Sequence, residues 1–177
     1  MLLADLAGTS EALRGTSARN EKVELIADLL ARTSGTDLEV VVAALCGAPP
    51  QGRIGVGWAT ARIDGTAGSP SLEIGDLDRL VDELAAAGGP GVKAERASLL
   101  AHFGSRATAL EADFVVRLLT GEMRQGALTG VVETAVAKAE GVPVAVVRRA
   151  AMLTGDLAAT AALARDGGRS ALEAVQI

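Results

Sequence analysis

Two short corners of the sequence combine glycine with arginine in a way that suits phosphate binding. Each comes after a predicted helix that a glycine ends, and the second leads directly into another helix. Backbone N–H groups at a helix start are unpaired, and glycine lets a phosphate approach them closely. A neighbouring guanidinium can bind the same phosphate. Ordinary turns with solvated arginines are the alternative that these residues leave open. The corners consist of Gly52, Arg53, Ile54 and Gly55, and of Arg124, Gln125, Gly126 and Ala127.

A third segment, 61–65, imitates the K-x-D-G signature of nucleotidyltransferases, in which a lysine amine attacks the α-phosphate of ATP. Position 62 is arginine here. A guanidinium stays protonated in proteins and cannot act as that nucleophile. The three lysines fall in predicted helices, and x-D-G follows none of them. The sequence therefore argues against a covalent nucleotidyl site in this chain.

The other reactive side chains do not assemble a catalytic or metal site. His102 is the only histidine and lies in a predicted helix without an evident partner, so we interpret it as a structural residue. Cys46 is the only cysteine; it ends an apolar helix, and we expect it in the core. One histidine and one cysteine are too few for a metal cluster. The sequence therefore predicts no catalytic residue, metal or cofactor in this chain.

Charge also limits the possible functions. The 177 residues carry a formal net charge of −5, which argues against a protein that binds nucleic acid through bulk charge. The charge is uneven, however. Segment 71–83 holds five acidic residues and one arginine, whereas segment 141–170 contains Arg148, Arg149, Arg165 and Arg169. A local basic face on an acidic molecule is therefore compatible with the composition.

The elements that must position these residues are helical, and the sequence predicts an all-α fold. Between 47 and 75, glycine and proline predict a long loop, which in a compact domain usually has a function. Ser17, Thr108 with Glu111, and Thr154 or Asp156 are expected caps, and Pro143 is expected in a first turn. Apolar residues recur at helical spacing in 18–33, 37–46, 76–87, 93–104, 109–120, 127–140, 143–152 and 155–165, and less clearly near 170–175.

The chain also matches itself at a shift of 74 residues. Residues 21–52 align without gaps on 95–126, with ten identities in 32 positions. The identities include Gly47/Gly121, Gln51/Gln125 and Gly52/Gly126, and Lys22/Arg96 is a conservative pair. We interpret the match as a duplication, with halves at about 17–60 and 92–140, that forms a pseudo-twofold unit. Duplex DNA has local twofold axes too, so such a unit could present equivalent loops to both backbones of one groove. Chance agreement between two amphipathic helix pairs is the alternative.

Four stretches resemble, in the same order, the N-terminal DNA-binding domain of ATP-dependent DNA ligases of the bacterial, actinobacterial type. The resemblance covers nearly the whole chain, and the third stretch is its most specific part. The stretches are TSARNEKVELIADLL, PPQGRIGVGWA, EADFVVRLLTGEMRQGAL and VAKAEGVPVAVVRRAAMLTGDLAATA.

The resemblance implies an all-helical domain that grips nicked double-stranded DNA through the minor groove and helps a C-terminal catalytic core of the same polypeptide to encircle it. It implies DNA contacts at both corners and at the MLTGDL turn. It places the catalytic lysine, the adenylation domain and the OB-fold domain beyond Ile177, so that ATP and Mg²⁺ belong to the parent enzyme. The residues added by the turn are Arg148, Arg149, Thr154 and Gly155.

The remaining expectations concern location and the competing function. The N-terminus has no basic region typical of a signal peptide, and no run of about 18 uncharged apolar residues could span a membrane. We therefore expect a cytoplasmic, nucleoid-associated protein. The alternative function is a helical protein–protein scaffold that docks partners through Trp58 and the 47–75 loop. The sequence does not distinguish roles in replication, repair or recombination.

Overall fold

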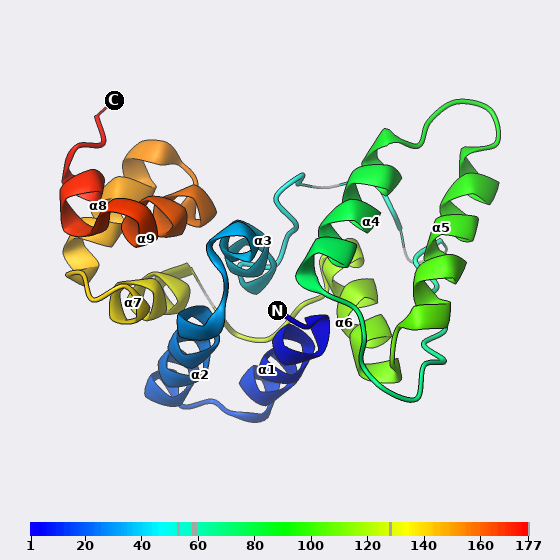
Figure 1. Ribbon diagram of the computed structural model, residues 1–177, viewed down its shortest axis with the longest axis horizontal. Coiled ribbons are helices and arrows are strands. Elements are labelled where there is room, and N and C mark those ends of the chain that lie inside the picture. Colours follow the sequence, from blue (N-terminus) through cyan, green and yellow to red (C-terminus); the bar gives the residue numbers. More distant parts are fainter. Residues whose placement is uncertain (53, 58–59, 128, 177) are drawn as a thin grey trace. The chain divides into compact units, whose positions relative to one another are not determined.

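The computed structural model describes residues 1–52, 54–57, 60–127 and 129–176 and is all-α, as the sequence predicts (Figure 1). In these residues the nearest approach to a sheet is a single bridge between Leu2 and Glu73. The helices are α1 (Leu3–Gly15), α2 (Arg19–Arg32), α3 (Gly35–Leu45), α4 (Ile74–Ala86), α5 (Val92–Arg106), α6 (Ala109–Thr120), α7 (Thr129–Ala139), α8 (Val144–Thr154) and α9 (Leu157–Glu173).

One helix differs from the sequence prediction. Helix α1 was not expected, because Gly8, Thr9 and Ser10 interrupt its apolar pattern with residues of low helix propensity. Its leucines nevertheless bury one face, and Leu3, Leu6 and Leu13 are fully buried. The predicted short helix near 170–175 corresponds to the last part of α9, which a non-helical residue, Gly168 with φ at 58°, separates from the rest.

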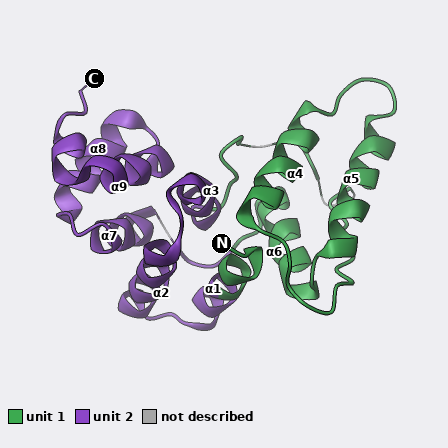
Figure 2. Cartoon of the chain, viewed as in Figure 1, with its two compact units in different colours: residues 1–8, 47–123 green, residues 9–46, 124–177 purple. Residues whose placement is uncertain are grey.

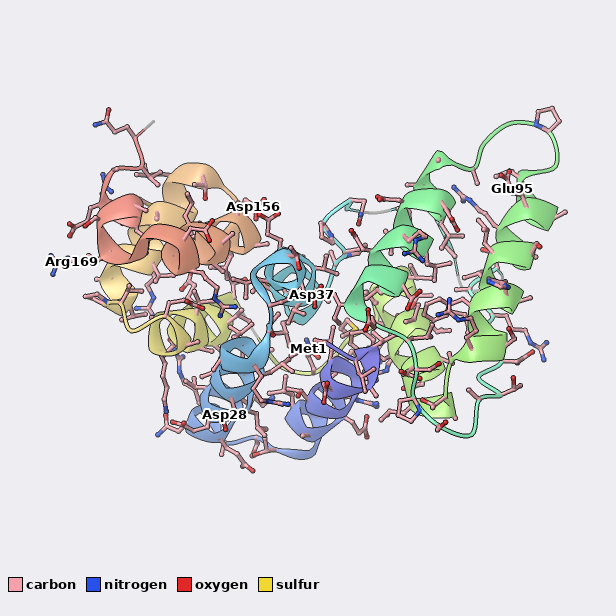
Figure 3. The ribbon with its side chains drawn as sticks, viewed as in Figure 1. Met1, Asp28, Asp37, Glu95, Asp156 and Arg169 are labelled. Atoms are coloured by element: carbon pink, nitrogen blue, oxygen red, sulfur yellow. The ribbon has the colours of Figure 1, made fainter. Side chains whose placement is uncertain are left out.

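The caps explain where several helices begin. Thr108 and Glu111 form the predicted capping box at α6, since each side chain accepts the other's backbone N–H. Asp156, labelled in Figure 3, caps α9 by accepting from Ala158 N at 2.8 Å and Ala159 N at 3.0 Å. Ser17 is not the cap of α2: Ala18 holds that position, and the Thr16 hydroxyl accepts from Ala18 N. Pro143, predicted in the first turn of its helix, lies at the N-cap of α8, one position before the first turn begins.

The chain divides into two compact units, each built from separate segments (Figure 2). Unit 1 comprises residues 1–8 and 47–123, and unit 2 comprises residues 9–46 and 124–177. In unit 1, α4 packs against α5, and the N-terminal residues pair with 72–74 through the backbone. In unit 2, α2 packs against α7, and α9 packs against both α3 and α8.

Unit 1 keeps the end of its long loop close to the corner between α5 and α6. Thr66 N and Ala67 N donate to Gly104 O and Ala107 O at 3.2 and 3.0 Å. Two glycines make this approach possible: a Cβ at Gly104 would lie 2.8 Å from Asp64 O, and one at Gly65 would lie 2.4 Å from Thr108 O. The predicted loop over 47–75 is therefore irregular but held in place at its end.

The helix bounds follow the internal sequence match. Helices α2 and α5 end at Arg32 and Arg106, and α3 and α6 begin at Gly35 and Ala109, both 74 positions apart. One helix pair lies in unit 2 and its counterpart in unit 1. After each helix pair the chain passes from one unit to the other, between residues 46 and 47 and between residues 123 and 124. Unit 2 therefore contains α2, α3 and the loop that follows α6. Unit 1 contains α5, α6 and the loop that follows α3.

No helix in the parts of the chain that the structure describes has the length and apolar character needed to cross a membrane.

Candidate nucleic-acid interface

The corner after α6 has an unusual backbone. Gly121 ends the helix in the left-handed conformation, with φ at 75°. Arg124 has φ at 38°, a region that side chains disfavour, and Gly126 follows at 62°. Arg124 and Gly126 are exposed, and Ala127 is half-buried. The corner therefore presents a guanidinium and a glycine backbone at the surface just before α7.

Gln125 occupies the inside of this corner. It is 3% exposed, and both ends of its amide are hydrogen-bonded. Its Nε2 donates to Leu45 O at 2.7 Å, and its Oε1 accepts from the Ser10 hydroxyl at 2.7 Å. The side chain of Gln125 thus points into unit 2 and holds the corner in position, and a DNA contact by this residue stays a prediction.

Lys22 lies directly under the same corner, although the sequence did not predict it as a site residue. It is 8% exposed, and its Nζ donates to Gln125 O at 2.8 Å. A Cβ at Gly126 would lie 2.5 Å from that nitrogen. The signal that could have found it is the Lys22/Arg96 pair of the internal repeat, because both copies keep a cation at this position.

The other corner, in unit 1, turns through two glycines. Gly52 N donates to Pro49 O at 2.9 Å, and Gly52 and Gly55 have φ values of 74° and 66°. Gly52 is half-buried and Gly55 is exposed. Ile54, expected at the DNA, is only 9% exposed and belongs to the core of its unit. Arg53 lies outside the described residues, as does Trp58 of the scaffold hypothesis.

The two glutamines that the repeat aligns have different surroundings. Gln51 is exposed, and its Nε2 donates to Asp78 and Asp82 of α4 at 2.8 and 2.7 Å. Gln125 is buried against backbone and a hydroxyl. Identity in the sequence match therefore does not extend to the environment of the side chain.

The basic segment near the C-terminus is largely paired. Arg148 contacts Glu133 at 3.1 Å, and Arg169, at the end of α9 in Figure 3, contacts Glu173 at 2.7 Å. Arg165 binds Glu140 and the carbonyls of Leu30 and Thr33, so it fastens α9 to the end of α2. These arginines therefore form less of an open basic face than the sequence suggests.

The MLTGDL turn follows the helix that carries Arg148 and Arg149. Arg149 is exposed and donates to Val175 O at 3.4 Å. Thr154 and Gly155 are exposed, and Gly155 ends α8 with φ at 69°. The Thr154 hydroxyl accepts from Asp156 N and lies 3.1 Å from the Thr160 hydroxyl. This turn is separate in sequence from the 124–127 corner but belongs to the same unit.

Cys46 is not the core residue that we expected. It follows α3 at the C-cap and is exposed. Desolvation by neighbouring atoms raises the pKa of the thiol to about 11, and the negative charges of Asp156 and Glu133 contribute. The thiol is therefore protonated at neutral pH and a poor nucleophile.

The remaining polar side chains give little scope for catalysis. His102 is exposed on α5 and lines a shallow cavity of about 110 Å³ with Asp76, Arg79 and Arg106. Arg62 faces Asp64 at 3.6 Å, and both are largely exposed. Within the described ranges, no three His, Cys, Asp or Glu residues are grouped as metal ligands.

This chain is similar to proteins described as DNA ligases. Residues 56–137 match the family model described as DNA ligase N terminus. A probable DNA ligase of Mycolicibacterium gilvum is 49% identical over 173 residues, covering 97% of this chain and 34% of that protein. Probable DNA ligases of Mycolicibacterium vanbaalenii and Nocardia farcinica are 51% and 48% identical, each match covering 97% of this chain and 33% of the relative.

The chain thus spans about a third of the length of these curated relatives. The agreement covers nearly all of the chain, including both corners and the turn after α8. The chain is thus similar over nearly its whole length to about a third of the length of proteins named probable DNA ligases, and residues 56–137 are similar to the DNA ligase N terminus family.

Proposed function

We propose that this chain is the DNA-binding domain of an ATP-dependent DNA ligase and that it holds nicked duplex DNA by its minor-groove backbone. The observation that carries the proposal is the corner of exposed Arg124 and Gly126 and half-buried Ala127, which lies just before α7 in a relative of proteins named probable DNA ligases. A ligase acts on any sequence, so its contacts go to phosphate and sugar rather than to bases.

The chemistry of the corner supports phosphate binding. The guanidinium of Arg124 offers several N–H donors in a plane, which suits the oxygens of a phosphate. The positive end of the α7 dipole adds a favourable field close to the helix start. Gly52 and Gly55 form the corresponding corner in unit 1, and Arg148, Arg149, Thr154 and Gly155 add contacts in unit 2.

In the parent enzyme, ATP and Mg²⁺ would bind to domains other than this one. Arg62 replaces the lysine that a nucleotidyl site requires, and no group of ligands suited to a metal lies in the described part of the chain. In the parent, a 3′-hydroxyl and a 5′-phosphate would be joined by the C-terminal catalytic core. This chain would bring the nick to that core and would not itself seal it.

The test is a titration of the 177-residue chain against nicked and intact duplexes of one sequence. We expect binding to the nicked duplex, and we expect Arg124→Ala to weaken it by about tenfold, the effect of losing one charge-assisted hydrogen bond. Circular dichroism should show the helical content of the variant unchanged, because Arg124 is exposed.

Lys138→Ala is the matched control. It removes one exposed cation from the same unit, where Lys138 is paired with Glu24. It should leave the dissociation constant within about twofold, the effect expected of an exposed ion pair. Absence of binding by the wild-type chain, or equal losses in both variants, would contradict the proposal.

A further inference from the structure

A buried lysine controls the direction of one peptide group in the 124–127 corner. Lys22 of α2 donates through Nζ to Gln125 O at 2.8 Å, beneath the surface. The described chain contains no cis peptide bond. In a trans peptide the C=O and the next N–H point in opposite directions. Because Lys22 draws the Gln125 carbonyl inward, the N–H of Gly126 faces outward.

Arg96 of α5 makes the same kind of contact in unit 1. Its Nη1 donates to Gly55 O at 3.3 Å, and its Nη2 donates to Ala87 O, at the end of α4, at 3.4 Å. By the same geometry, the carbonyl of Gly55 is held toward Arg96 and the peptide N–H of Val56 points away from it. Gly55 is exposed, as Gly126 is.

The two cations occupy equivalent positions, since 22 and 96 differ by the repeat shift of 74. Each lies near the start of the first helix of its pair. Each binds a carbonyl in the loop that follows the second helix of the other pair: Lys22 the loop after α6, and Arg96 the loop after α3. The contacts are therefore reciprocal, and each is made within a single unit.

We propose that Lys22 and Arg96 are positioning residues that orient the peptide groups of the two corners. Their role rests on the proposed function: the outward N–H of Gly126 is ready to donate to a DNA phosphate without reorganisation, and the held Gly55 carbonyl keeps the exposed glycine of the other corner in place. Holding a loop in its bound conformation strengthens binding because less ordering remains to be done when the ligand arrives. Neither cation needs to touch the DNA for this effect.

The orientation is tested by nuclear magnetic resonance on the ¹⁵N-labelled chain, without DNA. Lys22→Met keeps an unbranched side chain, one heavy atom shorter, and removes the donor. It should shift the Gly126 amide signal and leave that of Val56 in place, and Arg96→Met should do the reverse. Lys138→Met, which removes an exposed lysine from unit 2, should move neither. An unmoved Gly126 signal in Lys22→Met, or equal shifts of the Gly126 and Val56 signals in each variant, would overturn the proposal.

The effect on DNA is then measured at several salt concentrations. Lys22→Met should weaken binding to a nicked duplex by about tenfold and leave the slope of log K against log salt unchanged, because the bound corner still meets the same phosphates. Arg124→Ala should reduce the magnitude of this negative slope by about one. Lys22→Arg, which restores a donor, should recover most of the affinity. If Lys22→Met also reduced the magnitude of the slope by about one, Lys22 would contact a DNA phosphate directly, and the positioning role would be overturned.

The two proposals fail in different ways. If the wild-type chain does not bind nicked duplex, the proposed function fails. The amide shifts still decide between reciprocal positioning and a general loss of structure, since they are recorded on the chain alone.

Discussion

At the scale of single residues, the 124–127 corner separates side chains that face solvent from those that hold the backbone. Arg124 is exposed at a φ that side chains disfavour, and such backbone conformations persist only where the surroundings fix them. Gln125 fixes part of this backbone through its hydrogen bonds with Ser10 and Leu45 O, and Lys22 fixes another part. The conformation at exposed Arg124 is therefore supported by two buried side chains, those of Gln125 and Lys22.

The hydrogen bonds of Gln125 predict a stability effect. Gln125→Ala would remove the amide and leave Leu45 O without its donor in a buried site, which costs about 1–3 kcal/mol. We expect urea denaturation to show a loss of about 2 kcal/mol in the free energy of unfolding. Gln51→Ala, at the equivalent exposed position, should change it by less than about 0.5 kcal/mol. Equal losses would show that Gln125 is not a support of the corner.

At the scale of elements, close contact between the loop and α5 depends on a glycine inside the helix. Replacing an interior glycine by alanine normally favours a helix by about 1 kcal/mol. At Gly104, however, the added Cβ would lie 2.8 Å from Asp64 O and 3.2 Å from Ile63 Cγ2. Helix propensity therefore favours alanine at this position, whereas packing opposes it. The contact with Asp64 O is too short to be relieved without a shift of the backbone.

We expect Gly104→Ala to lower the free energy of unfolding by about 1–3 kcal/mol, as overpacking of a close contact does. Gly8→Ala in α1 is the matched control, since nothing lies within 4 Å of the added Cβ. That variant should gain up to about 1 kcal/mol from helix propensity. Thermal unfolding of the two variants measures the difference, and a stabilised Gly104→Ala would contradict the packing described for unit 1.

The start of α4 carries a charge that stabilises the fold. Burial alone would raise the pKa of Asp76, but hydrogen bonds from Glu73 N and Arg106, with the charges of Arg106 and Arg79, lower it below its usual value. A carboxyl with a lowered pKa in the folded state stabilises that state above the pKa of the unfolded chain. The stabilisation is lost as the pH falls through the folded value.

Asp76→Asn should therefore reduce the free energy of unfolding by about 1 kcal/mol at pH 7, because it keeps the cap acceptor and removes the charge. The difference from wild type should shrink as the pH falls below about 4, where the wild-type carboxyl also becomes neutral. Urea denaturation at several pH values measures it. Asp28→Asn, at an exposed aspartate of α2 (Figure 3), is the control and should change the free energy of unfolding at pH 7 by less than about 0.5 kcal/mol.

The sequence could predict most elements but few side-chain environments. Helical spacing located α2 to α9, because each needs only a local apolar pattern, and glycine and proline located the long loop. The core position expected for Cys46 was wrong, and the sequence did not reveal that Gln125 and Ile54 are buried. The partners of Gln125 are Ser10 and Leu45, far away in sequence, and no local pattern reveals such contacts. The cations at 22 and 96 were visible as a repeat pair, but their acceptors were not.

At the scale of the whole molecule, the net charge of −5 limits how DNA can be held. An acidic chain repels a polyanion over long distances, so binding must come from a few local phosphate contacts. About four such contacts would give a slope of log K against log salt near −3.6 and roughly a hundredfold loss of affinity between 50 and 200 mM salt. Fluorescence anisotropy with a labelled nicked duplex measures this slope. A slope near zero would exclude phosphate contacts as the source of binding.

The interleaved order of the two units has a consequence for synthesis on the ribosome. Unit 1 needs nothing beyond Met123, so it can complete its contacts while later residues are still being added. Helices α2 and α3 emerge first, yet α7 and α9, against which they pack, come last. Their buried faces, including Ile26, Leu30 and Val41, therefore stay uncovered during translation. A nascent chain stalled shortly after Met123 should accordingly be a target for chaperones that bind exposed apolar helices.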